Sequence, residues 1–171
     1  MMRAGLEPDP SPAPENDEER KQGRLAGALL GFVALVQSVV MFSRGLNGLG
    51  TTAPYLAVVL PAALFGFGTW RGRLRGGTIA FAVLWSVLSV CLAVVVSDFV
   101  TAHFSTLLSE TQARLLPWLI PVVAARAICF VAAIVVLVTG APGRSRRRAG
   151  GALALAFAVL FLAEQAFQLA P

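Results

Sequence analysis

Two charged residues, Arg126 and Glu164, lie inside long apolar runs of the sequence. Charges within membrane-crossing helices are costly, so they usually face protein or water and mark ion pairs, proton pathways or ligand sites. If the two runs form consecutive antiparallel helices, Arg126 lies roughly 12 Å and Glu164 roughly 10 Å from the same end, at about 1.5 Å per residue. The spacing therefore predicts opposite charges at nearly the same depth.

Other polar residues are predicted near this depth. Gln37 lies toward the same end of the first apolar run, Asp98 near that end of the third, and Gln168 just beyond Glu164. In one interpretation, Arg126 and Glu164 pair and lock a helix bundle, or each extends to the nearby interface. In the other, the cluster lines a cavity that binds an anionic or zwitterionic solute or a lipid headgroup. We favour the first, because paired intramembrane charges also serve packing.

The remaining residues with reactive side chains give weaker signals. His103, Glu110 and Arg114 share the polar side of an amphipathic segment, and one histidine without a second ligand favours a solvated helix face over a metal site. Cys91 and Cys129 lie in apolar runs without metal-ligand spacing and are expected to be small buried hydrophobes. The sequence indicates no catalytic motif, no metal and no cofactor.

The composition identifies the elements that must position these residues. The chain has 171 residues, of which 57% are hydrophobic and 13% are charged, whereas soluble domains carry about 25% charged residues. These values exclude a water-soluble fold and a disordered chain. Five apolar runs with short intervals between them predict an all-α integral membrane protein, a bundle of five transmembrane helices.

Charge and proline content divide the chain into two parts. Residues 1–24 hold six of the nine acidic residues and alternating prolines, which predicts a disordered cytoplasmic tail. Residues 25–171 form the predicted transmembrane domain. The spans are expected at about residues 25–43, 54–70, 77–97, 118–139 and 150–170, and the second is the shortest.

The basic residues predict the orientation of the bundle. Counted from residue 20 to the first span and then in each interval, they number three, one, three, one and four. This alternation predicts a cytoplasmic N-terminus and an external C-terminus, with the arginines near anionic headgroups; nucleic acid is not an expected partner. The groups are Arg20, Lys21 and Arg24; Arg44; Arg71, Arg73 and Arg75; Arg114; and Arg144, Arg146, Arg147 and Arg148.

The interval between the third and fourth spans has a helical pattern of its own. Apolar residues recur at helical spacing over about residues 99–116, opposite the polar stripe of His103, Glu110 and Arg114. This pattern predicts an amphipathic helix on the outer membrane surface. Pro117 is expected to separate that helix from the fourth span.

Small residues indicate where helices approach one another. Gly23, Gly27 and Gly31 lie four residues apart on one face of the first helix. Small faces let backbones come close in lipid, where dispersion contacts drive helix association. Packing within the chain is the first interpretation, and homo-oligomerisation through this helix is the second.

The sequence leaves two classes of function open. The first is a non-enzymatic accessory or scaffold component of a membrane assembly, with a membrane-protein partner or a homo-oligomer embedded in the lipid bilayer. The alternative is a small transporter or a lipid- or solute-binding protein that uses the cluster around Arg126 and Glu164. A membrane enzyme ranks third. The arginine-rich, alanine-rich composition predicts the plasma membrane of a high-GC bacterium.

Overall fold

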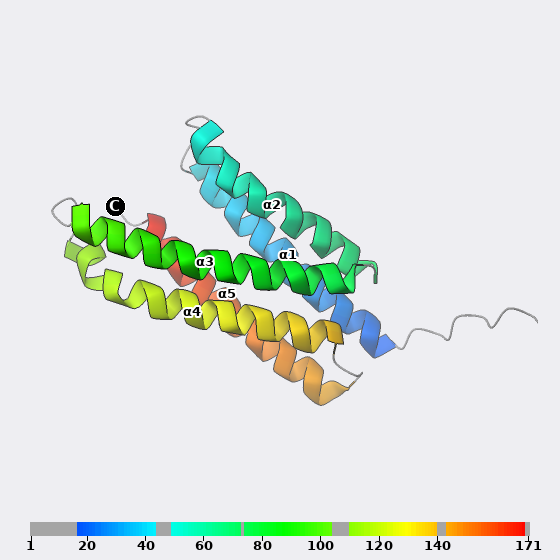
Figure 1. Ribbon diagram of the computed structural model, residues 1–171. Helices are drawn as coiled ribbons and strands as arrows, with labels where there is room; N and C mark the ends of the chain where they lie inside the picture. Colours follow the sequence, from blue (N-terminus) through cyan, green and yellow to red (C-terminus); the bar gives the residue numbers. More distant parts are fainter. Residues whose placement is uncertain (1–16, 44–48, 73, 104–109, 140–142, 170–171) are drawn as a thin grey trace, which may run out of the picture.

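The computed structural model describes residues 17–43, 49–72, 74–103, 110–139 and 143–169. These residues form five α-helices and no strand. Figure 1 shows the helices side by side, each running opposite to the next along the chain. They are α1 (Asp17–Ser43), α2 (Leu49–Trp70), α3 (Arg75–His103), α4 (Glu110–Thr139) and α5 (Arg144–Leu169).

The first helix begins within the segment that the sequence assigns to the acidic tail. Asp17, Glu18 and Glu19 form the first turn of α1. Carboxylates there interact favourably with the positive end of the helix dipole. The acidic residues therefore extend the apolar helix by two turns before residue 25, and residues 1–16 lie outside the described part of the chain.

A tight turn joins α2 to α3 and sets them antiparallel. Gly72 has a φ of 78° and Leu74 a φ of 62°, and the Gly72 N–H donates to the Thr69 carbonyl at 3.0 Å. The Thr69 and Thr78 hydroxyls are hydrogen-bonded to each other across the turn and are buried. Both polar groups are thus satisfied where the two helices meet.

The separate surface helix predicted over residues 99–116 is wrong for the described residues. The α3 helix continues to His103, and α4 starts at Glu110 and passes through Pro117 and Pro121 without ending. Proline removes one backbone hydrogen bond, which a long packed helix can tolerate. The amphipathic pattern therefore belongs to the ends of two long helices, and residues 104–109 are not described.

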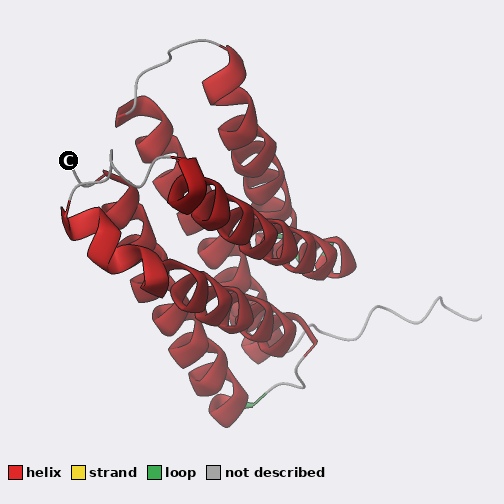
Figure 2. Cartoon of the chain, turned by 60° about the vertical axis from the view of Figure 1, so that its left-hand side comes forward, coloured by secondary structure: helices red, strands yellow, loops and turns green. Residues whose placement is uncertain are grey.

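Antiparallel connections gather the basic segments at one end of the bundle (Figure 1), and Figure 2 shows the same bundle from another side. This end, named here the basic end, contains the start of α1, the α2–α3 turn and the start of α5. Its described basic side chains are Arg20, Lys21, Arg24, Arg71, Arg144, Arg146, Arg147 and Arg148. The segments that hold three or four basic residues in the sequence therefore lie together at one end of the bundle.

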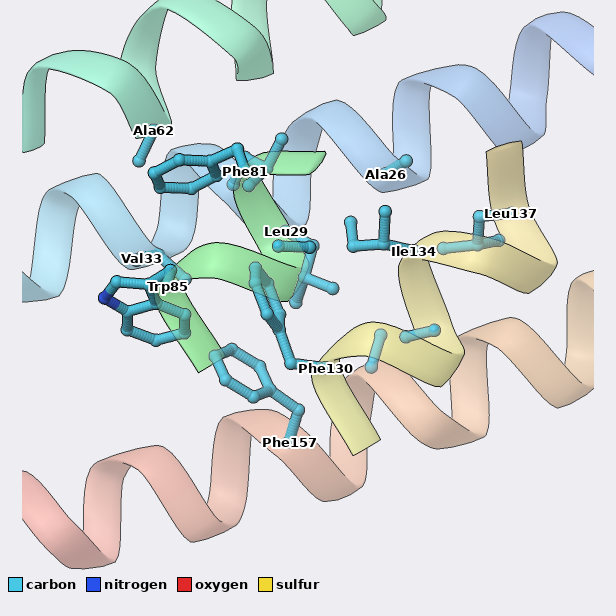
Figure 3. Close-up of a cluster of buried hydrophobic side chains, with 14 of the residues drawn as sticks. Ala26, Leu29, Val33, Ala62, Phe81, Trp85, Phe130, Ile134, Leu137 and Phe157 are labelled. Atoms are coloured by element: carbon cyan, nitrogen blue, oxygen red, sulfur yellow. The ribbon is translucent and has the colours of Figure 1, made fainter. Parts of the chain in front are cut away.

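The core lies where α1, α3, α4 and α5 meet, with α2 packed mainly on α1 and also on α3. Figure 3 shows Trp85 of α3 beside Phe130 and Phe157, with Val33 of α1 close by. These large apolar side chains pack α3, α4 and α5 against one another. The other fully buried core residues include Ala26, Leu30, Ala62, Ala82, Ala133, Ile134 and Phe161.

Large apolar side chains are exposed on the outside of the bundle. Four helical segments are long and apolar enough to cross a membrane, and at most 39% of the apolar 18-residue stretch in any of them is buried. They are Asp17–Ser43, Gly76–Val95, Pro117–Thr139 and Arg144–Ala166, and α2 holds a shorter apolar stretch, Tyr55–Trp70. Large apolar side chains project outward from each helix, among them Phe42, Leu64, Leu88, Ile128 and Leu155.

Candidate functional site

A buried ion pair joins α4 to α5. The Arg126 Nη1 lies 2.9 Å from the Glu164 Oε2, and the two side chains are 2% and 10% exposed. The structure therefore brings together the two charges that were matched by depth in the sequence. The pair lies away from the basic end, as the count of residues along the two helices requires.

Aromatic rings enclose the guanidinium. The Arg126 Cζ lies 4.7 Å from the centroid of the Trp85 ring and 5.4 Å from that of Phe161. Trp85 in turn makes edge-to-face contacts with Phe130, Phe157 and Phe161 at centroid distances of 5.0, 6.1 and 5.8 Å. A cation over an aromatic face is attracted by the ring quadrupole, and more strongly without water. Three helices thus contribute to one charged and aromatic centre.

Helical periodicity explains why these side chains point inward. Val123, Arg126 and Phe130 are buried on one face of α4 at spacings of three and four residues. Phe161 and Gln165 are likewise buried on α5, four residues apart. Residues with these spacings lie on the same side of a helix. Arg126 and Gln165 therefore occupy positions that the pattern of the helix assigns to the core.

Three buried polar atoms at this centre and nearby have no hydrogen-bond partner among the described residues. They are the Arg126 Nε, the Gln165 Oε1 and, on α3 next to Trp85, the Ser86 Oγ. Burying a polar group without a partner costs about 1–3 kcal/mol. The Arg126 Nε donor, the Gln165 Oε1 acceptor and the Ser86 hydroxyl can thus still form hydrogen bonds.

Gln37 of α1 lies at nearly the same depth along the bundle as Gln165 of α5, but its side chain is only half-buried. The ring centroids of Phe32 and Phe161 lie 6.2 Å apart, so these two residues are at the same depth on α1 and α5. The two helices run in the same direction, so Gln37 and Gln165, five and four residues further on, reach nearly the same depth. No contact between Gln37 and the ion pair is described.

The other residues of the predicted polar groups belong to helices, but their side chains lie outside the described part of the structure. Asp98 belongs to α3 and Gln168 to α5, each near the end away from the basic end. His103 is the last residue of α3 and Glu110 the first of α4, and Arg114 follows one turn later.

The glycines of the first helix pack against α2. A Cβ at Gly27 would lie 2.7 Å from the Gly66 carbonyl oxygen, and one at Gly23 would lie 3.4 Å from the Thr69 oxygen. Gly31 has open space around its Cβ direction. Two of the three predicted glycines thus lie at a contact within the chain, and the third is exposed.

Sequence reasoning missed Trp85, Phe161 and Gly66. Phe157 and Phe161 lie four residues apart, and Phe161 precedes Glu164 by three. This spacing could have predicted that Phe157, Phe161 and Glu164 share one face of α5.

The expectation for the cysteines was also partly wrong, because Cys91 is exposed on the outside of α3 and Cys129 is half-buried. An apolar run around a cysteine indicates an apolar setting, but it does not say which face of the helix the cysteine occupies.

The chemistry open to this centre is that of a fixed, enclosed charge pair. The Glu164 carboxylate is held by the guanidinium, and both are covered by protein. No protein-family model, curated protein or solved structure matches the chain.

Proposed function

We propose that the chain is a non-enzymatic integral membrane protein that acts as an accessory or scaffold component of a membrane assembly. The observation that carries the proposal is that protein encloses the ion pair of Arg126 and Glu164. Arg126 and Glu164 are 2% and 10% exposed, and Trp85 and Phe161 cover the guanidinium. A charge pair of this kind holds helices in one arrangement, which is what a scaffold requires.

The surface supports the membrane part of the proposal. Outward-facing apolar side chains cover four helices long enough to cross a hydrocarbon core of about 30 Å. With α2 as a fifth, shorter span, the basic end faces the cytoplasm and the C-terminus lies outside. Hydrophobic mismatch at α2 is relieved by tilt or by local thinning of the bilayer.

A second candidate function has one observation in its favour. The Arg126 Nε and the Gln165 Oε1 are buried and lack hydrogen-bond partners among the described residues. A donor and an acceptor in these positions suit a small polar or zwitterionic ligand or a lipid headgroup. This second candidate is a small transporter or a lipid- or solute-binding protein.

Native mass spectrometry after mild detergent extraction separates the two functions. We expect the wild-type chain to carry a membrane protein at fixed stoichiometry, and the variant Arg126→Met with Glu164→Leu to keep it. A lone protomer with a bound small molecule, lost in the double variant, would reject the scaffold function and support the second candidate. The matched control is Trp118→Phe, a change on the exposed side of α4.

A further inference from the structure

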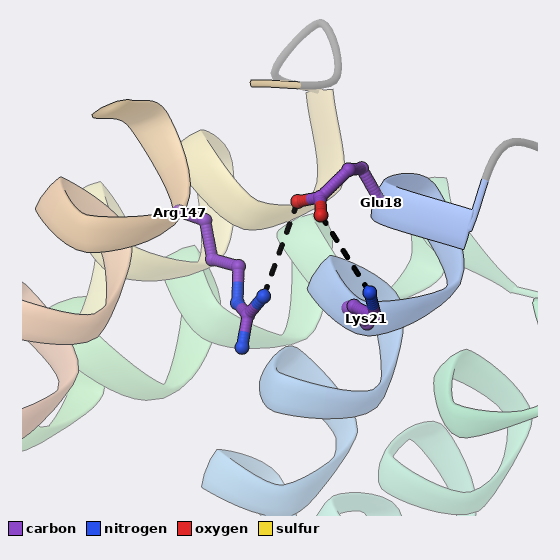
Figure 4. Close-up of polar contacts among 3 residues, drawn as sticks. All are labelled: Glu18, Lys21 and Arg147. Atoms are coloured by element: carbon purple, nitrogen blue, oxygen red, sulfur yellow. Dashed lines mark ion pairs between the residues drawn. The ribbon is translucent and has the colours of Figure 1, made fainter. Parts of the chain in front are cut away.

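The helices α1 and α5 begin beside each other at the basic end, where one carboxylate lies between two cations. The Glu18 Oε1 is 3.7 Å from the Lys21 Nζ, and its Oε2 is 4.0 Å from the Arg147 Nη1 (Figure 4). Lys21 and Arg147 are 50% and 47% exposed. Both contacts are long, and the Glu18 Oε2 is buried without a hydrogen-bond partner among the described residues, so Glu18 is held weakly and can be displaced.

The start of α5 is electrostatically unfavourable on its own. Arg144, Arg146, Arg147 and Arg148 are all exposed within its first turns. Like charges three and four residues apart on a helix repel, and cations are disfavoured at the positive end of the helix dipole. An anion at this place is therefore stabilised by the arginines and by the helix itself.

A buried amide adds an observation that is independent of the charges. Gln22 is 2% exposed, and its Nε2 donor has no hydrogen-bond partner among the described residues. It lies one turn after Glu18, on the same face of α1. Side chains of a helix lean toward its N-terminus, so the Gln22 amide is directed toward the turn that carries Glu18. That turn is where α1 meets Arg147 of α5.

We propose that the starts of α1 and α5 form a binding site for a phosphate group. Arg147 and Lys21 supply the positive charge, and the Gln22 amide donates a hydrogen bond from the interior. Glu18 is a built-in competitor that occupies the site until phosphate replaces its carboxylate. The phosphate belongs to an anionic phospholipid headgroup or to a free phosphate ion, which present the same oxygens to the protein.

The test titrates the full-length protein in an uncharged detergent with phosphatidylglycerol and counts retained lipid by native mass spectrometry. We expect Arg147→Gln to weaken retention about tenfold, as the loss of a charge-assisted contact requires. Glu18→Gln should tighten retention about two- to fivefold, because an exposed ion pair no longer competes. Gln22→Met should weaken retention without changing any charge. Phosphatidylcholine, which has no net charge, should be retained less by the wild type.

Arg144→Gln is the matched control, because it removes one exposed charge from the start of the same helix. Equal weakening by Arg144→Gln and Arg147→Gln, with Gln22→Met unchanged, would show only diffuse attraction and would overturn the site. Unchanged or weaker retention by Glu18→Gln would overturn the competition. Adding inorganic phosphate distinguishes the two sources of the phosphate group. If it displaces the lipid, the site also binds the free ion. If it does not displace the lipid, the site is specific for lipid headgroups. Glu18 and Arg147 are partly exposed, so Glu18→Gln and Arg147→Gln are expected to fold.

Discussion

Gly27 and Gly66 bring the backbones of α1 and α2 into contact. A Cβ at Gly27 would lie 2.7 Å from the Gly66 carbonyl oxygen and 3.0 Å from the Trp70 Cβ. A Cβ at Gly66 would lie 3.2 Å from the Gly27 carbonyl oxygen. The approach requires glycine on both helices, because a backbone atom cannot move aside as a flexible side chain can.

Gly27→Ala should therefore destabilise the protein. The added methyl group must push α2 away, and overpacking of this kind costs about 1–3 kcal/mol. Gly31→Ala is the control, since it lies one turn later on α1 with open space around it, and better helix propensity should make it neutral or stabilising. Thermal unfolding in detergent measures both. A stable Gly27→Ala protein would mean that α1 and α2 do not approach this closely in solution.

Removing one partner of the ion pair should destabilise the protein more than removing both. Glu164→Ala leaves a guanidinium that cannot lose its proton, whereas Arg126→Ala leaves a carboxylate that can take one up. Glu164→Ala should therefore be the more harmful single change, at about 3–5 kcal/mol. Arg126→Met with Glu164→Leu should recover stability, because apolar side chains suit the site.

A double-mutant cycle built from Arg126→Met, Glu164→Leu and the variant that carries both, followed by chemical or thermal unfolding in detergent, measures the coupling between Arg126 and Glu164. Adjacent charges should give a coupling of about 0.5–3 kcal/mol. A coupling of zero would show that the two side chains do not meet in the folded protein.

Trp85→Leu should destabilise the bundle by about 3 kcal/mol or less, since it removes ring contacts and the cation–π contact with Arg126. Trp118→Leu is the matched control, because Trp118 is 64% exposed and Trp85 only 6%. Unfolding in detergent, followed by circular dichroism, gives both values. Similar losses for the two variants would contradict a special role for the aromatic centre.

The proposed orientation is tested by cysteine labelling in intact cells after Cys91 and Cys129 are replaced by alanine. Single cysteines at positions 48 and 109 should react with an impermeant thiol reagent. Single cysteines at positions 72 and 145 should react only after the cells are opened. Labelling at position 72 from outside would reject the five-span topology.

The sequence predicts where helices end better than how they are rotated. Ser43, Trp70 and Thr139 are the last residues of both the predicted spans and the observed helices. Glycine or arginine follows each of these apolar runs within two residues, and either one interrupts an apolar helix. Depth along a helix also follows from simple counting, which is why Arg126 and Glu164 could be matched.

Contacts between helices depend on rotation, and a nearly uniform apolar pattern hides it. The α3 helix is apolar on both sides, so nothing in its pattern marks Trp85 as buried and Leu88 as exposed. Gly66 was missed because its partner lies on another helix. The predicted surface helix was wrong because an amphipathic pattern also suits the ends of two long helices.

The cation–π contact between Arg126 and Trp85 has a consequence for biosynthesis. A ribosome makes Arg126 before Glu164, and at about 5–20 residues per second the arginine waits some seconds for its carboxylate. Trp85 precedes both in the chain, so its ring is already available when Arg126 emerges. The indole can thus cover the guanidinium while α5 is still being translated, and the later arrival of Glu164 completes the neutralisation.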